Sequence, residues 1–132
     1  MRKDVEVWVQ QAEIDLETAE KNFHYEIYYA SAFFCQQALE KMMKALFMLQ
    51  RKERVPTTHN LRELGESISL PENLLSKARK ISRDFIVSRY PDAAGDIPAK
   101  AYDKEITADI LEDTRKVFEW LEKEIEKFQT LK

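Results

Sequence analysis

Residues that interrupt regular structure are scarce in this chain, which has only 2 glycines and 4 prolines among 132 residues. Sandwiches and barrels need a turn about every eight to twelve residues, and those turns are rich in glycine and proline. So few turn residues limit the chain to a small number of long elements, which indicates helices. A chain of this length buries one hydrophobic core of useful size, so we expect a single domain over residues 1–132.

Apolar residues recur at steps of three and four along four stretches, as they do in amphipathic helices. The first stretch ends before His24, and the second spans about residues 27–51. Pro71 suits the first turn of the third stretch, which should run to about residue 87. Asp103 is a suitable N-cap for the fourth, which continues almost to the last residue.

A shorter helix is indicated between the second and third stretches. Asn60, with Glu63 three residues later, resembles a capping box, and this helix should end near Gly65. Residues 87–102 show no helical period and are expected to form an irregular loop that carries part of the site. Together these patterns predict an all-α, up-and-down four-helix bundle with one short additional helix.

The second helix carries apolar side chains on more than one side. Cys35 lies on its main apolar stripe and is expected to be a small buried residue, whereas Phe33, Phe47 and Met48 lie away from that stripe. Two interpretations follow. Either this helix is the central one of the bundle, or these three side chains form half of a dimer interface.

Polar residues interrupt the middle of the same helix. Gln36, Glu40 and Lys44 are each four residues apart and form one row, with Gln37 and Lys41 beside them. An exposed ion pair at this spacing contributes only a few tenths of a kcal/mol, so a surface pair is one explanation of the row. A functional surface is the other.

Two loops carry further candidate site residues. Arg54 and His59 precede the short helix, where they could bind a phosphate or serve as capping and packing residues. In the later loop, the forked guanidinium of Arg89 can bind a phosphate or carboxylate, and Tyr90 and Tyr102 can stack on a base. The same side chains could instead fix that loop to the bundle.

Composition excludes several classes of site. With a net charge of −3, the chain has no global positive field that would attract nucleic acid. The two glycines lie far apart, so there is no phosphate-binding glycine loop, and no cluster of residues has metal-ligand spacing. We therefore predict neither a metal nor a cofactor. The amphipathic start and the single cysteine predict a cytoplasmic protein without a signal peptide or membrane span.

Three segments, taken in order, carry a family resemblance. They are Phe34-Cys35-Gln36-Gln37-Ala38-Leu39-Glu40-Lys41-Met42-Met43-Lys44-Ala45-Leu46, His59-Asn60-Leu61-Arg62-Glu63-Leu64 and Arg89-Tyr90-Pro91-Asp92. The chain resembles the HEPN domain family over nearly its whole length. That resemblance implies a helical bundle, commonly a homodimer, that often works beside a minimal nucleotidyltransferase. It also implies one of two activities: binding of a nucleotide or another small phosphate ligand, or metal-independent RNA cleavage.

The nuclease relatives have an arginine followed a few residues later by a histidine, in the second half of the domain. Arg89 stands where such an arginine is expected, but no histidine occupies positions 94–96. Arg54 and His59 are suitably spaced, yet they precede the third long helix. His59 matches the element after the second helix, for which the resemblance implies capping or ligand contact.

The interpretation we prefer is a HEPN-type module that dimerises and binds a nucleotide, acting with a minimal nucleotidyltransferase in a toxin-antitoxin-like pair. Its ligand-binding residues would be Lys44, His59, Arg89 and Tyr90, together with Gln37, Glu40 and Tyr102. One alternative is a metal-independent RNase in which His59 is the base and Arg54 or Arg89 stabilises the phosphate. The other is a dimeric interaction protein without a ligand.

Overall fold

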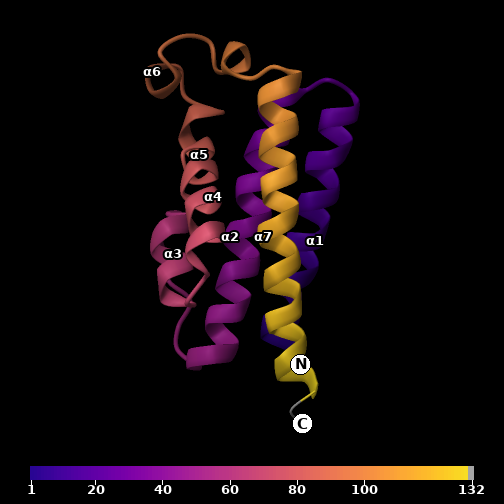
Figure 1. The fold of residues 1–132 in the computed structure, drawn as a ribbon, viewed down its shortest axis with the longest axis vertical. Helices are drawn as coiled ribbons and strands as arrows, with labels where there is room; N and C mark the ends of the chain where they lie inside the picture. Colours follow the sequence, from indigo (N-terminus) through magenta and orange to yellow (C-terminus); the bar gives the residue numbers. More distant parts are fainter. Residues whose placement is uncertain (131–132) are drawn as a thin grey trace.

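All regular structure in residues 1–130, which the computed structural model describes, is helical (Figure 1). Four helices have 11 residues or more: α1 (Lys3–His24), α2 (Tyr28–Arg51), α4 (Glu72–Ser82) and α7 (Lys104–Thr130). The shorter elements are α3 (Leu61–Ser67), α5 (Asp84–Val87), α6 (Pro91–Ala94) and the 3₁₀ turn η1 (Pro98–Ala101). The all-α prediction is therefore confirmed. No helix among residues 1–130 has both the length and the apolar character that a membrane span needs.

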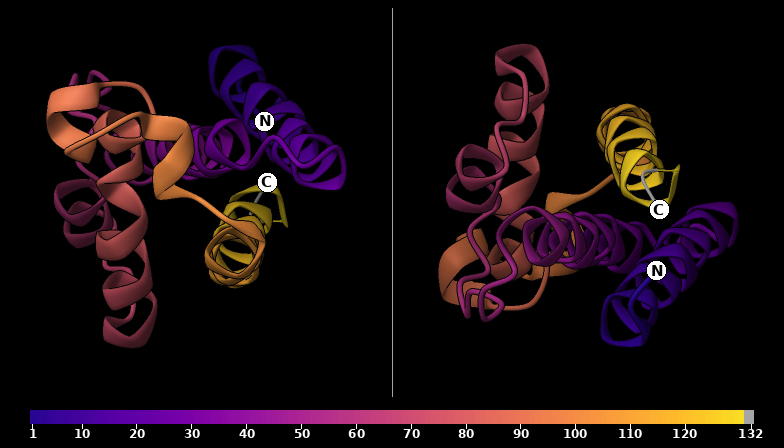
Figure 2. Two further views of the ribbon diagram at one scale, coloured as in Figure 1. Left: turned by 90° about the horizontal axis from the view of Figure 1, so that it is seen from above. Right: turned by 90° about the horizontal axis from the view of Figure 1, so that it is seen from below.

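The central helix of the bundle is α2. It packs against α1 and α7 on one side and against α3, α4 and α5 on the other, as the two end-on views show (Figure 2). Phe47 and Met48 are each only 7% exposed and belong to the main hydrophobic core. The second apolar side of α2 is thus covered within one chain. The central-helix interpretation holds, and these two side chains are not available for a dimer interface.

The third long helix ends earlier than its apolar period predicts. The pattern indicates one continuous helix to about residue 87, but α4 ends at Ser82 and α5 begins at Asp84. Arg83 between them keeps right-handed helical angles (φ −61°, ψ −25°), so the break in hydrogen bonding is local. At this break the Ser82 hydroxyl accepts a hydrogen bond from the Leu61 N–H (2.9 Å), which fixes α3 beside α4.

Asn60 caps α3 as predicted. Its side chain accepts hydrogen bonds from the backbone N–H groups of Arg62 (2.9 Å) and Glu63 (3.2 Å). The other half of the expected capping box is made by a different residue, because the Asn60 N–H donates to Thr58 Oγ1 (3.0 Å) and not to Glu63. The two side chains that make this cap, Thr58 and Asn60, therefore lie on either side of the candidate histidine in the same loop.

Gly65 lies inside α3 and does not end it, because the helix continues to Ser67. A Cβ atom at this position would lie 2.7 Å from Leu75 Cδ1 and 3.2 Å from Leu70 Cδ2. The glycine is required for close packing of α3 against its neighbours and not for a left-handed turn. The helix ends two residues after Gly65, close to the predicted point, but the glycine does not cap it.

The segment between α5 and α7 is more regular than predicted, since α6 and η1 each form one helical turn. Gly95 ends α6 with a left-handed backbone (φ 78°), which a glycine adopts without strain. Tyr102 anchors the end of the segment, because its buried hydroxyl donates to Asp84 Oδ1 (2.5 Å). Asp103 then caps α7 as expected, with Oδ1 accepting from the Ile106 N–H (2.8 Å).

Candidate ligand-binding site

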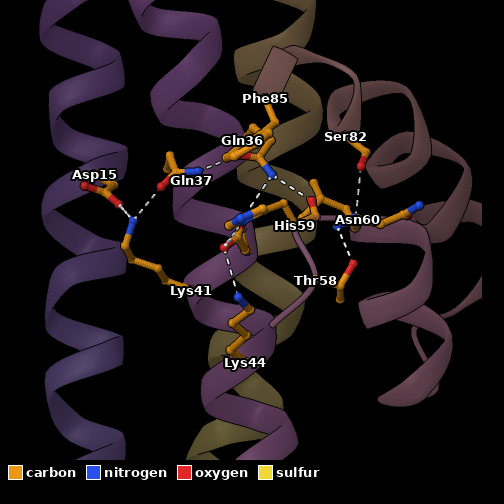
Figure 3. Close-up of polar contacts among 12 residues, drawn as sticks. Asp15, Gln36, Gln37, Lys41, Lys44, Thr58, His59, Asn60, Ser82 and Phe85 are labelled. Atoms are coloured by element: carbon orange, nitrogen blue, oxygen red, sulfur yellow. Dashed lines mark hydrogen bonds and ion pairs between the residues drawn. The ribbon is translucent and has the colours of Figure 1, made fainter. Parts of the chain in front are cut away.

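A buried carboxylate organises the polar residues of the central helix. Glu40 is 5% exposed and accepts hydrogen bonds from Lys44 Nζ (3.0 Å) and Gln36 Nε2 (3.2 Å). The Nδ1 atom of His59, on the loop before α3, lies 3.1 and 3.0 Å from its two oxygens (Figure 3). The predicted row along α2 therefore exists, but it is neither a surface pair nor an open surface, because this loop covers it.

The contact between Glu40 and His59 fixes the tautomer of the imidazole. A carboxylate only accepts hydrogen bonds, so Nδ1 of His59 carries the hydrogen and Nε2 of the neutral ring keeps its lone pair. Burial raises the pKa of Glu40, but hydrogen bonds from Lys44, His59 and Gln36 outweigh this effect and hold the pKa below its ordinary value. Glu40 is therefore ionised at neutral pH and orients the histidine.

Further hydrogen bonds join this carboxylate to α1. Gln37 Nε2 donates to Gln36 Oε1 (2.8 Å), and Lys41 Nζ donates to Gln37 Oε1 (3.0 Å). Lys41 also forms an ion pair with Asp15 of α1 (2.6 Å). His59 is thus held by one continuous network that crosses two helices, as Figure 3 shows, and its orientation is restricted accordingly.

Aromatic and cationic side chains surround His59. Its ring stacks on Phe85 of α5, with the centroids 4.1 Å apart and the planes at 14°. The Arg89 guanidinium lies 4.3 Å from the Phe85 centroid, and 5.0 Å and 5.1 Å from the centroids of Phe33 and Tyr90. These are cation–π distances, so Arg89 is held over ring faces while it stays exposed. We call His59, Phe85 and Arg89 the aromatic stack.

A cavity of about 380 Å³ opens beside the aromatic stack. Its wall comes from the loop before α3, from α3 itself and from the α4–α5 junction: Thr58, His59, Asn60, Glu63, Ser82, Arg83, Phe85 and Ile86. The hydrogen bond between Leu61 and Ser82 holds these two parts of the wall together. Arg83 is exposed and supplies a second guanidinium to the cavity.

This arrangement suits a flat ligand that carries negative charge. The exposed ring of Tyr90 can stack on a heterocycle, whereas the Phe85 ring is already covered by His59 and Arg89. The two guanidinium groups, on Arg83 and Arg89, can each bind a phosphate through two parallel hydrogen bonds. Nε2 of His59 accepts a hydrogen bond from a hydroxyl when the ring is neutral and donates one to an anion when it is protonated.

Four of the predicted site residues lie together around Phe85. His59 and Arg89 both lie against the Phe85 ring, and Tyr90 lies against the Arg89 guanidinium. Glu40 is in hydrogen-bond contact with His59. The sequence motifs that contain them lie far apart in the chain, on α2, in the loop before α3 and in the segment that follows α5. The fold therefore brings the three motifs to one face of the bundle.

Two other predicted residues are buried away from this face. Lys44 is 4% exposed beneath Glu40, and its Nζ lies 5.9 Å from the Trp8 ring centroid. Tyr102 is also buried, and its hydroxyl is committed to Asp84. Neither side chain reaches the cavity, because each is needed to satisfy a buried carboxylate.

Gln37 and Arg54 are not part of the aromatic stack either. Gln37 points toward Lys41 and α1 (Figure 3). Arg54 is exposed on the loop after α2 and forms no hydrogen bond or ion pair within residues 1–130. The proximity of Arg54 to His59 in the sequence thus does not produce a contact in this structure.

The sequence pattern does not reveal that Phe85 belongs to the site. Phe85 continues the apolar period of α4 and is therefore assigned to the core, although it is only half-buried. A signal for its true role exists, because Arg89 follows it by four residues and so lies on the same helical face. Arg83 and Asp84 carry no comparable signal, since the break between α4 and α5 determines where they point.

The fold and site define a class of protein: a helical bundle in which a buried carboxylate on the central helix orients a loop histidine at the surface. The chain belongs to the HEPN domain family, whose model matches residues 5–125. This match confirms the resemblance carried by the three sequence motifs. No match was found among curated proteins.

Two solved structures have the same fold along almost their whole length. TT1696 from Thermus thermophilus is 25% identical to this chain, with a TM-score of 0.84, and the match covers 93% of this chain and 99% of TT1696. ST0689, described as an archaeal HEPN homologue, is 27% identical with a TM-score of 0.76, and the match covers 95% of this chain and 99% of ST0689. The arrangement of helices is therefore shared with bacterial and archaeal proteins.

Proposed function

We propose that this HEPN protein is a nucleotide-binding module whose ligand lies against the aromatic stack. The observation that carries the proposal is that one ring, Phe85, holds both the His59 imidazole (4.1 Å) and the Arg89 guanidinium (4.3 Å) beside an open cavity. Stacking of a base and charge-assisted binding of a phosphate need these groups side by side. The function requires no bond to be made or broken.

Each group has a separate task in this function. Arg83, in the cavity wall, and Arg89, over the Phe85 ring, bind phosphate oxygens. Tyr90, which is 49% exposed, covers the base, and His59 hydrogen-bonds to the ligand through Nε2. Glu40 does not touch the ligand, but keeps the imidazole in one orientation, so less conformational freedom is lost on binding.

Titration calorimetry with ADP tests this function. Arg89→Ala is expected to weaken ADP binding about tenfold, because a hydrogen bond to a charged group contributes roughly 1.5–3 kcal/mol. Arg79→Ala is the matched control, since this arginine is exposed on α4 and forms no hydrogen bond or ion pair within residues 1–130. Equal affinity of the wild-type protein and Arg89→Ala would contradict the proposal, as would an equal loss in both variants.

Exposed apolar side chains at one end of the bundle support association with other proteins. They lie on the α1–α2 turn and the start of α2, beside η1 and at the start of α7, at the top of Figure 1: Tyr25, Ile27, Tyr29, Ile97 and Ile106. Apolar surface gathered in this way is typical of protein interfaces. We propose that this end is covered in a homodimer. The family resemblance further suggests a cytoplasmic toxin-antitoxin-like pair with a minimal nucleotidyltransferase.

The orientation of His59 favours a second candidate function, metal-independent RNA cleavage. Because Glu40 holds Nδ1, the lone pair on Nε2 is available to take a proton from a ribose hydroxyl. The 2′-oxygen would then attack the adjacent phosphorus, the phosphorus bond to the 5′-oxygen would break, and the departing 5′-oxygen would take back the proton from His59. This gives a 2′,3′-cyclic phosphate and a 5′-hydroxyl, and Arg89 would stabilise the charged phosphate during the step. Incubation with a mixed RNA pool in EDTA tests this alternative. Cleavage that is lost in His59→Ala would establish the RNase function. Intact RNA would leave nucleotide binding as the one remaining candidate function.

A further inference from the structure

The wall of the cavity beside the aromatic stack has a single carboxylate within residues 1–130, that of Glu63 in the first turn of α3. A carboxylate is unexpected in a site for phosphate, because like charges repel each other. In a capping box this side chain would accept a hydrogen bond from the Asn60 N–H. That N–H donates to Thr58 Oγ1 instead (3.0 Å), so capping does not explain the Glu63 carboxylate.

The other side-chain oxygens of the wall already accept hydrogen bonds from backbone N–H groups. These oxygens are Thr58 Oγ1, Asn60 Oδ1 and Ser82 Oγ, at distances between 2.9 and 3.2 Å from their donors, as Figure 3 shows for Thr58 and Ser82. The exposed carboxylate of Glu63 accepts no hydrogen bond and forms no ion pair within residues 1–130. Glu63 is therefore the side chain of the wall whose oxygens are available to donors on a ligand.

The charges of the wall indicate what such a ligand must contain. The exposed guanidinium of Arg83 requires an anion, whereas the Glu63 carboxylate requires hydrogen-bond donors. A nucleotide has both, because its phosphates are anions and its ribose carries two neighbouring hydroxyl groups. An acidic side chain is also the group that binds ribose hydroxyls in dinucleotide-binding folds.

We propose that Glu63 binds the 2′- and 3′-hydroxyls of the ribose and so selects ribonucleotides over 2′-deoxyribonucleotides. This inference rests on the proposed nucleotide-binding function and assigns the sugar within it. Each carboxylate oxygen accepts one hydroxyl, and the phosphates lie at Arg83 and Arg89. Hydrogen bonds to an ionised acceptor are stronger than those to a neutral one, so the sugar contributes to affinity as well as to selectivity.

Titration calorimetry of the full chain with ADP and 2′-deoxyADP tests this assignment. The two ligands share the base and the phosphates and differ in one hydroxyl, so the ratio of their dissociation constants measures the effect of that hydroxyl. The wild-type protein should bind ADP about tenfold more tightly than 2′-deoxyADP. This comparison uses only the wild-type protein, so it does not depend on whether a variant folds.

Two variants then locate the group that recognises the hydroxyl. Glu63→Gln keeps the size of the side chain and should bring the ratio close to 1, because an amide offers one neutral oxygen in place of two charged ones. Loss of the negative charge also changes phosphate binding, but this effect is the same for both ligands and cancels in the ratio. Glu72→Gln is the matched control, because Glu72 is exposed in the first turn of α4, forms no ion pair within residues 1–130 and lies outside the cavity wall. It should leave the ratio at about ten.

The possible results separate this inference from the function on which it rests. Equal wild-type affinities for ADP and 2′-deoxyADP would overturn the role of Glu63 and leave nucleotide binding intact. A tenfold ratio that persists in Glu63→Gln, or that falls equally in Glu72→Gln, would also overturn it. No binding of ADP at millimolar concentration would contradict the proposed function itself, and the ribose assignment with it.

Discussion

Glu40 is the residue on which the candidate site depends most, because three side chains share its carboxylate. Glu40→Gln removes the charge and leaves the nearly buried Lys44 ammonium without a counter-ion. Breaking a buried pair in this way typically costs about 3 kcal/mol or more of unfolding free energy. Urea denaturation should show this loss. Glu112→Gln breaks an exposed pair at the same four-residue spacing and should have almost no effect. Similar small changes in both variants would mean that Glu40 and Lys44 are not coupled.

Asp84 is expected to make the stability of the protein depend on pH. Its pKa is raised from 3.8 to about 6, mainly by burial, so the folded state binds a proton more tightly than the unfolded state. The contribution of Asp84 to the free energy of unfolding is therefore fully present below about pH 4 and is lost as the pH rises through 6. The full loss amounts to about 3 kcal/mol.

Urea denaturation between pH 4 and 7 measures this effect by comparison of the wild-type protein with Asp84→Asn. The difference in unfolding free energy between the two proteins should change by roughly that amount across the range and be constant above pH 7. Because the two proteins share all their other carboxylates, the titration of those groups cancels in this difference. A difference that does not vary with pH would show that Asp84 titrates normally.

At the level of single elements, α3 is short and depends on its N-cap. Asn60→Ala removes the acceptor for two backbone N–H groups and should destabilise the protein by about 1 kcal/mol in thermal or urea unfolding. Asn73→Ala is the control, because Asn73 is an exposed residue inside the first turn of α4 and does not cap it. If the two substitutions cost the same, the cap on α3 does not contribute to stability.

The apolar periods were sufficient to predict which elements are helical, because each of the four longest helices buries one stripe. The same reasoning fails where burial comes from a distant part of the chain. Gln36, Glu40 and Lys44 resemble a surface row, since only the path of the loop with His59 shows that they are covered. Phe85 shows the opposite error, because it follows a core period and yet forms the floor of an open site. The loop that covers the row on α2 leaves no local signal, whereas Arg89, four residues after Phe85, is a local signal for the role of that ring.

On the scale of the whole molecule, the apolar end of the bundle predicts a homodimer. Sedimentation at micromolar concentration should give twice the mass of the chain. Ile97→Glu, which places a charge on this end at a residue that is 53% exposed, should shift the protein to a monomer without unfolding it. Ile14→Glu, at an equally exposed position on α1, should leave the dimer intact. A wild-type monomer would contradict the proposed association.

The nucleotide-binding function is tested most directly by NMR, because resonances report both whether ADP binds and where. We predict saturable shifts of the His59 imidazole and of the amides of Phe85 and Arg89. Arg89→Ala should reduce these shifts at the same ADP concentration. Shifts confined to other parts of the bundle, or none at millimolar ADP, would contradict the assignment of the aromatic stack as the ligand site.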